Sequence, residues 1–178
     1  MTGLRYRANE VIRFAILPIA AGLAGWVGVT AAAAPGTTPT VPCADRIAVT
    51  RFPYRESGYR VVLGVISAPP AYLPQDVVAT HRRPWTYWLK QGLVVRANGM
   101  TVTVSVPERW RARAAITWGN NTGIVSSLRI AGCGSDQHAG NAYAGGFFLR
   151  ARSGCVPLIF RVGTRSAIVR FGIGRRCA

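Results

Sequence analysis

The sequence predicts an all-β fold, an antiparallel β-sandwich of immunoglobulin-like or related topology, preceded by an N-terminal apolar signal or anchor helix. Short runs rich in β-branched and aromatic residues recur roughly every ten residues along most of the chain. Turns rich in Gly, Pro and Asn separate these runs, and no stretch after the N-terminal segment shows the apolar spacing of a helix. Short, regularly spaced strands are typical of antiparallel sandwiches and barrels.

The N-terminal segment predicts export. Three arginines open the chain: Arg5, Arg7 and Arg13. An uncharged and mostly apolar stretch follows over residues 14–33. Signal peptidase reads a basic region, an apolar region and then small residues at positions −3 and −1 of the cut. Ala31 and Ala33 fit these two positions, which predicts cleavage before Ala34.

An uncleaved signal-anchor is the alternative, because an apolar stretch of about twenty residues can span a bilayer. In both cases the N-terminal arginines stay inside and the rest of the chain is exported, to an extracellular or cell-surface location. The predicted organisation is a signal peptide or signal-anchor over residues 1–33, a Pro/Thr-rich linker over residues 34–42 and a disulfide-stapled β domain over residues 43–178.

Eight or nine short strands are expected in this domain. They cover residues 59–67, 84–90, 93–97, 100–106, 113–118, 124–130, 147–151, 156–162 and 167–173. Asn98–Gly99 lies between two apolar runs and predicts a type I′ hairpin, because both residues tolerate a positive φ. Gly163–Ser166 predicts a second hairpin. Residues 132–146 are rich in small side chains and are expected to form a loop.

The cysteines predict two disulfides. There are four: Cys43, Cys133, Cys155 and Cys177. An even number in an exported chain indicates disulfide bonds, and four cysteines allow three pairings. Cys43 and Cys177 lie near the two ends of the domain, and Cys133 and Cys155 flank the glycine-rich segment, which favours Cys43–Cys177 with Cys133–Cys155. The spacing is wrong for a metal site, since no two cysteines are two to four residues apart. Neither a metal nor another cofactor is expected.

The charge predicts an anionic partner. Three of the 22 basic residues and one of the six acids lie before residue 34, which leaves a net charge of +14 on the remainder. All basic residues except Lys90 are arginines. A net charge this far from zero attracts a protein to anionic surfaces. Binding to nucleic acid by charge alone follows in vitro, without predicting a specific nucleic-acid partner.

Two clusters combine arginine with aromatic residues. The first comprises Arg82, Arg83, Trp85 and Trp88, and the second comprises Arg109, Trp110, Arg111 and Arg113. Guanidinium groups bind phosphate and carboxylate through paired N–H donors, and aromatic rings stack on sugars or bases. If the second cluster lies in a strand, its three arginines share one face. These eight residues are the candidate ligand-binding residues. The alternative is a solvated charged face over tryptophans that belong to the core.

The evidence for catalysis in the sequence is weak. Ser135, Asp136 and His138 stand in one loop, although the members of a catalytic triad are rarely neighbours in sequence. His81 precedes two arginines and has no orienting group nearby. A glycosidase needs two carboxylates across one sugar bond. The acids after residue 33 are scattered: Asp45, Glu56, Asp76, Glu108 and Asp136. No catalytic residue is assigned.

The C-terminal part resembles a known block of sequence. The matching segments are Asn141–Phe147 (NAYAGGF), Cys155–Leu158 (CVPL), Val162–Gly163 and Val169–Cys177 (VRFGIGRRC), within about 37 residues. This wording is similar to the C-terminal block of a family of exported actinobacterial proteins to which no activity is assigned. The resemblance implies export from a bacterium and no particular function.

The leading interpretation is a non-enzymatic, exported binding module that associates with the anionic bacterial cell envelope. Wall polymers that carry phosphate or carboxylate, or anionic lipid head groups, are the expected partners. Contact with the membrane itself is expected only through an uncleaved leader. A hydrolase that acts on the cell wall and a structural or interaction module with incidental charge are the alternatives.

Overall fold

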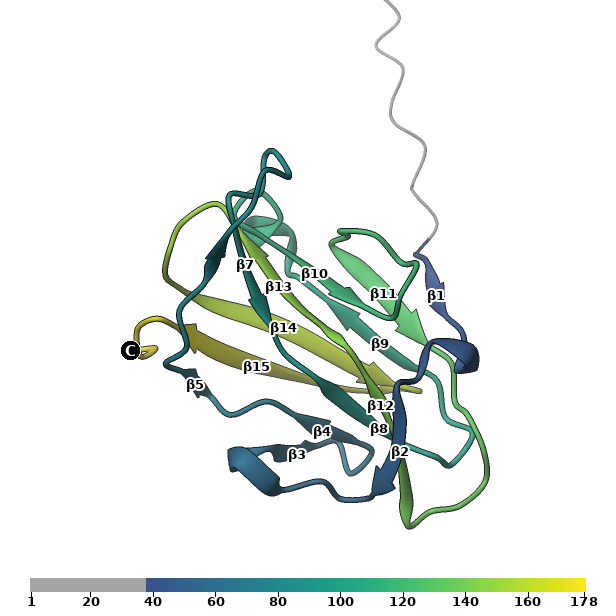
Figure 1. The fold of residues 1–178 in the computed structure, drawn as a ribbon. Coiled ribbons are helices and arrows are strands. Elements are labelled where there is room, and N and C mark those ends of the chain that lie inside the picture. Colours follow the sequence, from purple (N-terminus) through teal and green to yellow (C-terminus); the bar gives the residue numbers. More distant parts are fainter. Residues whose placement is uncertain (1–37) are drawn as a thin grey trace, which may run out of the picture. The chain divides into compact units, whose positions relative to one another are not determined.

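The computed structural model describes residues 38–178, and the predicted leader lies outside them. The described part is all β, as the sequence predicts, and it comprises fifteen strands and three short 3-10 helices (Figure 1). None of the helices in residues 38–178 has the length and apolar character that a membrane crossing needs.

The strands are more numerous than expected, and most of them are shorter than the expected runs. The first eight are β1 (Thr40–Val41), β2 (Ala48–Arg51), β3 (Arg60–Val62), β4 (Ile66–Ala68), β5 (Tyr72–Leu73), β6 (Val78–Ala79), β7 (Tyr87–Lys90) and β8 (Leu93–Arg96). The others are β9 (Val102–Ser105), β10 (Ala114–Trp118), β11 (Ser127–Ile130), β12 (Ala139–Tyr143), β13 (Gly145–Leu149), β14 (Gly154–Val162) and β15 (Arg165–Ile173). The 3-10 helices are η1 (Cys43–Asp45), η2 (Glu56–Gly58) and η3 (Glu108–Trp110).

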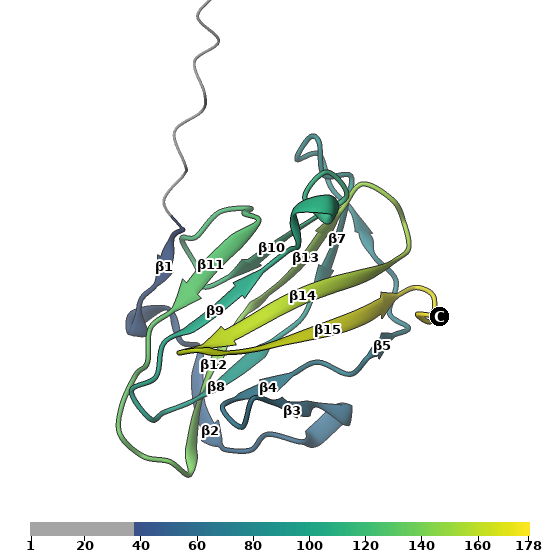
Figure 2. The same cartoon turned by 180° about the vertical axis from the view of Figure 1, so that it is seen from behind.

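Three sheets make up the domain. A six-stranded sheet has the order β1-β11-β9-β14-β15-β5, a four-stranded sheet has β10-β13-β7-β6, and a five-stranded sheet has β2-β12-β8-β4-β3. All pairs are antiparallel except β1 with β11 and β15 with β5. β7 leads directly into β8, and β12 into β13, so the four- and five-stranded sheets are continuous along the chain. Figures 1 and 2 show these two sheets on one side and the six-stranded sheet on the other.

One core fills the space between the sheets. Alternation along β14 turns Val156, Leu158 and Phe160 inward, and all three are fully buried. Trp118 of β10 is also fully buried, and its indole N–H donates to the backbone oxygen of Gln91 at 3.1 Å. This bond satisfies a polar group whose burial without a partner is costly.

The expected hairpin at Asn98–Gly99 is wrong. β8 pairs with β12 and β4 in the five-stranded sheet, whereas β9 pairs with β11 and β14 in the six-stranded sheet. Gly99 has a φ of +77°, and Asn98 is not in the left-handed region that a type I′ turn requires. The Asn98 side-chain oxygen instead accepts from the N–H of Met100 at 3.3 Å. The residues after β8 therefore connect two layers.

The run 59–67 forms a hairpin rather than one strand. β3 and β4 pair with each other, with Val62 opposite Ile66. Leu63 and Gly64 make the turn, with φ of +52° and +75°. Two consecutive residues with positive φ are the signature of a type I′ turn. The signal for this turn was Gly64, since a glycine inside a strand pattern often marks an interruption.

The expected loop 132–146 is also wrong, because it contains β12 and the start of β13. Its glycines reflect close packing of strands. A Cβ atom on Gly145 would run into the backbone oxygen of Thr117, and one on Gly146 into the backbone oxygen of Leu89. By contrast, the hairpin at Gly163–Ser166 is confirmed, since β14 and β15 pair through Val162 and Arg165.

Gly145→Ala is expected to lower the free energy of unfolding by about 1–3 kcal/mol, because the added methyl group forces β13 away from β10. Gly154→Ala is the matched control, since a Cβ there meets only a Val156 methyl group at 4.0 Å. Urea unfolding of both variants tests the difference. Equal stability of the two variants would contradict the close approach of the strands.

The disulfide pairing differs from the expected one. The bridges are Cys43–Cys133 and Cys155–Cys177, with Cα–Cα distances of 5.7 and 5.2 Å. β1, just before Cys43, pairs with β11, just before Cys133, which brings these two cysteines together. The β14–β15 hairpin returns the C-terminus to Cys155. Strand pairing, which the spacing of cysteines does not reveal, decides the connectivity.

The packed domain begins before the expected boundary at residue 43. Thr40 and Val41 of the expected linker form β1, and Val41 is fully buried. The Arg129 N–H donates to the Pro39 oxygen at 2.8 Å. This short parallel pair places η1 and Cys43 beside β11.

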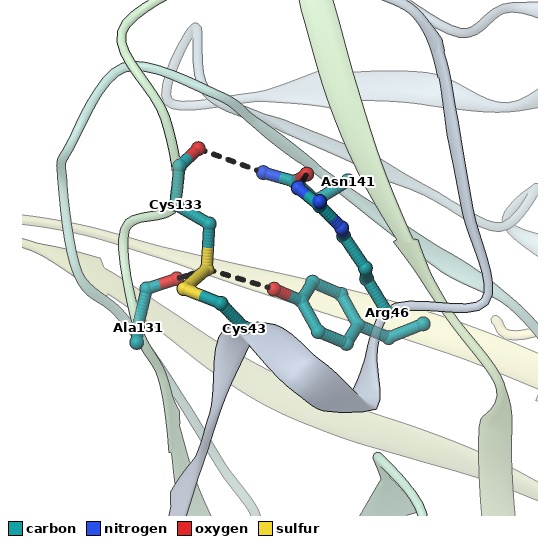
Figure 3. Close-up of a disulfide and its surroundings, with 6 residues drawn as sticks. Cys43, Arg46, Ala131, Cys133 and Asn141 are labelled. Atoms are coloured by element: carbon teal, nitrogen blue, oxygen red, sulfur yellow. Dashed lines mark hydrogen bonds between the residues drawn. A yellow bond between two sulfur atoms is a disulfide. The ribbon is translucent and has the colours of Figure 1, made fainter.

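Polar groups surround the Cys43–Cys133 bridge (Figure 3). The Asn141 side chain is buried and donates to the Cys133 backbone oxygen at 2.9 Å, and its own oxygen accepts from Arg46 at 3.4 Å. The Tyr143 hydroxyl lies 3.4 Å from the Cys133 Sγ. A disulfide sulfur carries no hydrogen, so the hydroxyl is the donor. Burial raises the pKa of Tyr143 above 10.0; the Asp45 carboxylate also raises it, and Arg46 lowers it.

Stability is expected to be constant through neutral pH and to fall above about pH 10. A tyrosine whose pKa is raised in the folded state stays neutral there, while the unfolded chain ionises from 10.0 upward. Burial raises the pKa of Tyr59 as well, with the same sign. Urea midpoints at pH 8 and pH 11 measure the loss, and Tyr143→Phe should make it smaller. An equal loss in wild type and Tyr143→Phe would assign the effect to other groups.

Candidate functional site

The two predicted clusters converge at one end of the four-stranded sheet. β13 lies between β10 and β7, so the start of β10, the end of β13 and the start of β7 are adjacent. The backbone N–H of Arg150 donates to the backbone oxygen of Arg113 at 3.2 Å. The backbone oxygen of Arg150 in turn accepts from the Thr86 hydroxyl at 2.8 Å. Figures 1 and 2 show the loop that leads into β7 and the helical turn before β10 at this same end.

We call this region the basic end. It comprises Arg82, Arg83, Trp85, Arg109, Trp110, Arg111, Arg113, Arg150 and Arg152. Every arginine in this set is exposed. Arg150 and Arg152 follow β13, and nothing in the local sequence distinguishes them from other exposed arginines. The strand order places Arg150 beside the two predicted clusters, and Arg152 follows it by two residues.

Arg82, Arg83 and Trp85 of the first cluster lie on a closed loop between β6 and β7. The Thr80 N–H donates to the Thr86 oxygen at 2.8 Å and closes the base of the loop. Inside the loop, the Trp85 N–H donates to the Arg82 oxygen at 2.8 Å. The loop therefore presents Arg82 and Arg83 to solvent from a hydrogen-bonded turn rather than from a free chain.

The second cluster forms a helical turn, so the expected row of three arginines on one strand face does not exist. η3 begins at Glu108, and the backbone N–H of Arg111 donates to the backbone oxygen of Glu108 at 3.1 Å. The Arg113 N–H donates to the Trp110 oxygen at 2.8 Å, and β10 begins only after it. Pro107 precedes this turn and ends the extended backbone of the preceding strand. The arginines surround the turn instead of lining up.

Two tryptophans hold arginines in place. The Arg113 guanidinium lies 5.5 Å from the centre of the Trp110 ring, and that of Arg150 lies 5.8 Å from the Trp85 ring. Trp110 also packs against the core and is only partly exposed. Contacts between a cation and a ring orient the planar guanidinium and leave its N–H groups available. These tryptophans thus act as supports for arginine rather than as open stacking platforms.

The other two tryptophans near the clusters lie apart from the basic end. Trp88 of β7 stacks on Phe148 of β13, with ring centres 6.2 Å apart. Trp118 belongs to the core. Of the candidate residues, Trp88 is therefore the one that the structure separates from the rest. Arg82 belongs to the basic end and also lies near Trp88, because both residues line one surface hollow.

The basic surface continues onto the outer face of the six-stranded sheet. Arg109 of η3 and Arg170 of β15 line one surface hollow of about 560 Å³. Glu108 also lines this hollow, together with apolar residues such as Ile159 and Ile168. Two arginines and one carboxylate therefore line this hollow.

Three of the carboxylates considered for catalysis accept hydrogen bonds from neighbouring groups. The Asp136 carboxylate accepts from the backbone N–H of His138 at 2.8 Å, which makes a turn. The Asp45 carboxylate is buried and accepts from the Asn120 N–H at 2.9 Å. The Glu56 carboxylate accepts from the Tyr54 hydroxyl at 3.3 Å. Within residues 38–178, no group of three or more His, Cys, Asp or Glu side chains could hold a metal ion.

Comparison with known proteins adds no assignment. The sequence matches no protein-family model and no curated protein. The relation to exported actinobacterial proteins stays a prediction from the C-terminal block. A functional conclusion therefore rests on the geometry and charge of the described residues.

Proposed function

We propose that this protein is a non-enzymatic binding module that holds anionic polymers of the bacterial cell envelope through its basic end. One observation carries the proposal. The hydrogen bonds that the Arg150 backbone makes with Arg113 and Thr86 join two clusters that lie about 25 residues apart in sequence. Seven exposed arginines then lie at one end of the domain.

The form of the site favours an extended ligand. Arginine binds phosphate and carboxylate through paired N–H donors, and several such groups suit a polymer with repeating charges. The basic end is an exposed surface built from loops and turns, and its neighbouring hollow on the six-stranded sheet is open to solvent. A chain can lie across such a surface and contact several arginines at once.

The location belongs to the same proposal. Two disulfides fit an oxidising compartment and therefore agree with a place outside the cytoplasm. Export by the predicted leader, cleaved or retained as an anchor, would bring the basic end to the cell wall or to anionic lipid head groups. A β-sandwich of immunoglobulin-like topology, the finer form of the all-β fold, stays a prediction with it.

Neutralising the basic end is expected to abolish binding. The test variant replaces Arg82, Arg83, Arg109, Arg111 and Arg113 by Gln. A control variant with the same net charge replaces Arg51, Arg55, Arg129, Arg161 and Arg165, which are exposed on other strands and turns. The oxidised proteins are compared for sedimentation with isolated cell walls and for affinity to long-chain polyphosphate.

The site predicts that only the first variant loses binding, by more than about tenfold relative to the control. An equal loss in both variants would show that net charge alone drives association. Walls stripped of their phosphate polymers and vesicles of anionic lipid then distinguish a wall polymer from a lipid surface as the source of the anions.

A further inference from the structure

A second recess lies on the outer face of the four-stranded sheet. Its volume is about 390 Å³, within the range of small-molecule sites. Val78, Arg82, Trp88, Asn120, Ile124 and Phe148 are among the residues that line it. None of the lining residues is acidic. The basic end is an open surface, whereas this recess has a floor and two walls.

The floor of the recess is apolar and lies on the side of the sheet away from the core. Alternation turns Leu89 and Phe147 into the core, and so turns Trp88 and Phe148 outward. These two residues are direct cross-strand partners, and their rings lie within 28° of parallel. Val78 pairs with Trp88 from β6 and is 61% exposed. Three apolar side chains thus form a row across three strands on an outer face.

One wall is a loop that the fold holds in place. After β10 the chain turns back at Gly119 and pairs Val125 with Ile116, through N–H to oxygen bonds of 2.8 and 3.0 Å. The Thr122 hydroxyl donates to the Trp118 oxygen at 2.6 Å. The bond from Asn120 to the buried Asp45 fixes the start of the loop. Asn120 and Ile124 are thereby held over the sheet.

The opposite wall supplies the charge. Arg82 stands on the closed loop after β6 and lines the recess. Its guanidinium is the only charged group among the lining residues of this recess, all of which belong to the part of the chain that the structure describes. A cation at the edge of an apolar floor complements a ligand that has a hydrophobic body and an anionic group at one end.

We propose that this recess binds a small amphipathic anion, with an apolar body of one or two rings against Trp88 and Phe148 and a carboxylate, sulfonate or phosphate at Arg82. This site adjoins the polymer surface of the basic end and shares Arg82 with it. A ligand of this size fits the recess volume of about 390 Å³.

The probe for the test is 8-anilinonaphthalene-1-sulfonate, whose rings and sulfonate match the two halves of the recess. Titration of the folded, oxidised protein should give saturable binding of one probe per chain, with quenched tryptophan fluorescence. Arg82→Gln should weaken binding by about tenfold, the loss of one charged hydrogen-bonding partner. Val78→Asp should abolish binding, because it places a carboxylate beside the sulfonate, and Val78→Ala should not.

Two controls make the result specific. Arg83→Gln removes the neighbouring charge outside the recess, and Ile168→Ser removes an apolar side chain that is 67% exposed on the six-stranded sheet. Both should leave probe binding unchanged. Unchanged binding in Arg82→Gln and Val78→Asp, or a loss in Ile168→Ser, would overturn the proposal. A variant neutralised at Arg109, Arg111 and Arg113 should lose polyphosphate binding and keep the probe, so either proposal can fail without the other.

Discussion

Replacing Cys43 and Cys133 together by alanine is expected to lower the free energy of unfolding by about 4–5 kcal/mol. The bridge joins residues separated by 90 positions and therefore restricts most of the unfolded chain. Loss of the Cys155–Cys177 bridge, which spans 22 positions, is expected to cost about 3 kcal/mol in the same treatment of chain entropy. Both values are large beside the total stability of an ordinary domain, about 5–15 kcal/mol.

The native contacts act in the same direction as the chain entropy. Cys133 is buried, and its sulfur accepts from the Tyr143 hydroxyl, which loses that partner when the sulfur is removed. Asn141 keeps its bond to the Cys133 backbone oxygen in the variant, so the neighbouring strands retain one polar connection. The loss in the Cys43/Cys133 variant should therefore equal or exceed the entropic value.

Equilibrium unfolding in urea, with each double variant compared with the oxidised wild type, measures both losses. The order is the informative result: the variant without Cys43–Cys133 should be the less stable one. The reverse order would mean that the Cys155–Cys177 bridge contributes more to the free energy of unfolding than the Cys43–Cys133 bridge does. A mass gain of four hydrogen atoms on reduction of the wild type checks that both bridges are present.

The sequence predicts the all-β class well because alternation is a local property. Val102, Val104 and Val106 alternate with Thr103 and Ser105, and the structure buries all three valines, two in β9 and one directly after it. The same pattern says nothing about which strand lies beside β9. The expected hairpin at Asn98–Gly99 failed for this reason, since each of its arms has partners in a different sheet.

Glycine misled the prediction in two opposite ways. Gly64 stood inside an apolar run, where it made a turn that the β-branched neighbours concealed. Gly145 and Gly146 stood in a segment of small residues that resembled a loop, where they allow two strands to approach β13 closely. A turn with positive φ and a close approach of two strands both favour glycine, and a single sequence does not distinguish the two cases.

The sequence predicts which residues belong to the candidate site, but it does not predict that the fold brings them together. Arginine and tryptophan in alternation indicated both clusters, and seven of the eight candidates lie at the basic end. Their meeting depends on β13, which lies between β7 and β10 although it comes after both in the chain. Arg150 and Arg152 follow β13 and for that reason could be found only from the fold.

Binding of a polyanion to the basic end is expected to weaken about 100-fold when the salt concentration rises from 50 to 200 mM. Each phosphate that an arginine contacts releases counterions, and on a flexible single-stranded polyanion each contact contributes about −0.7 to the slope of log K against log salt. Five arginines acting together then give a slope of about −3.5. Long-chain polyphosphate or a single-stranded oligonucleotide serves as the probe, with affinity measured by fluorescence anisotropy at several salt concentrations.

The slope distinguishes a site from a general attraction. The variant with Gln at Arg82, Arg83, Arg109, Arg111 and Arg113 should lose most of the slope, because the contacts that release counterions are gone. The variant neutralised at five arginines elsewhere has the same net charge and should keep it. Screening of distant charges is already strong at these concentrations, where the Debye length is about 10 Å, so only arginines in contact with the polymer contribute. A slope reduced equally in both variants would mean that the polymer contacts the whole surface, and that the convergence of the two clusters serves the fold rather than binding.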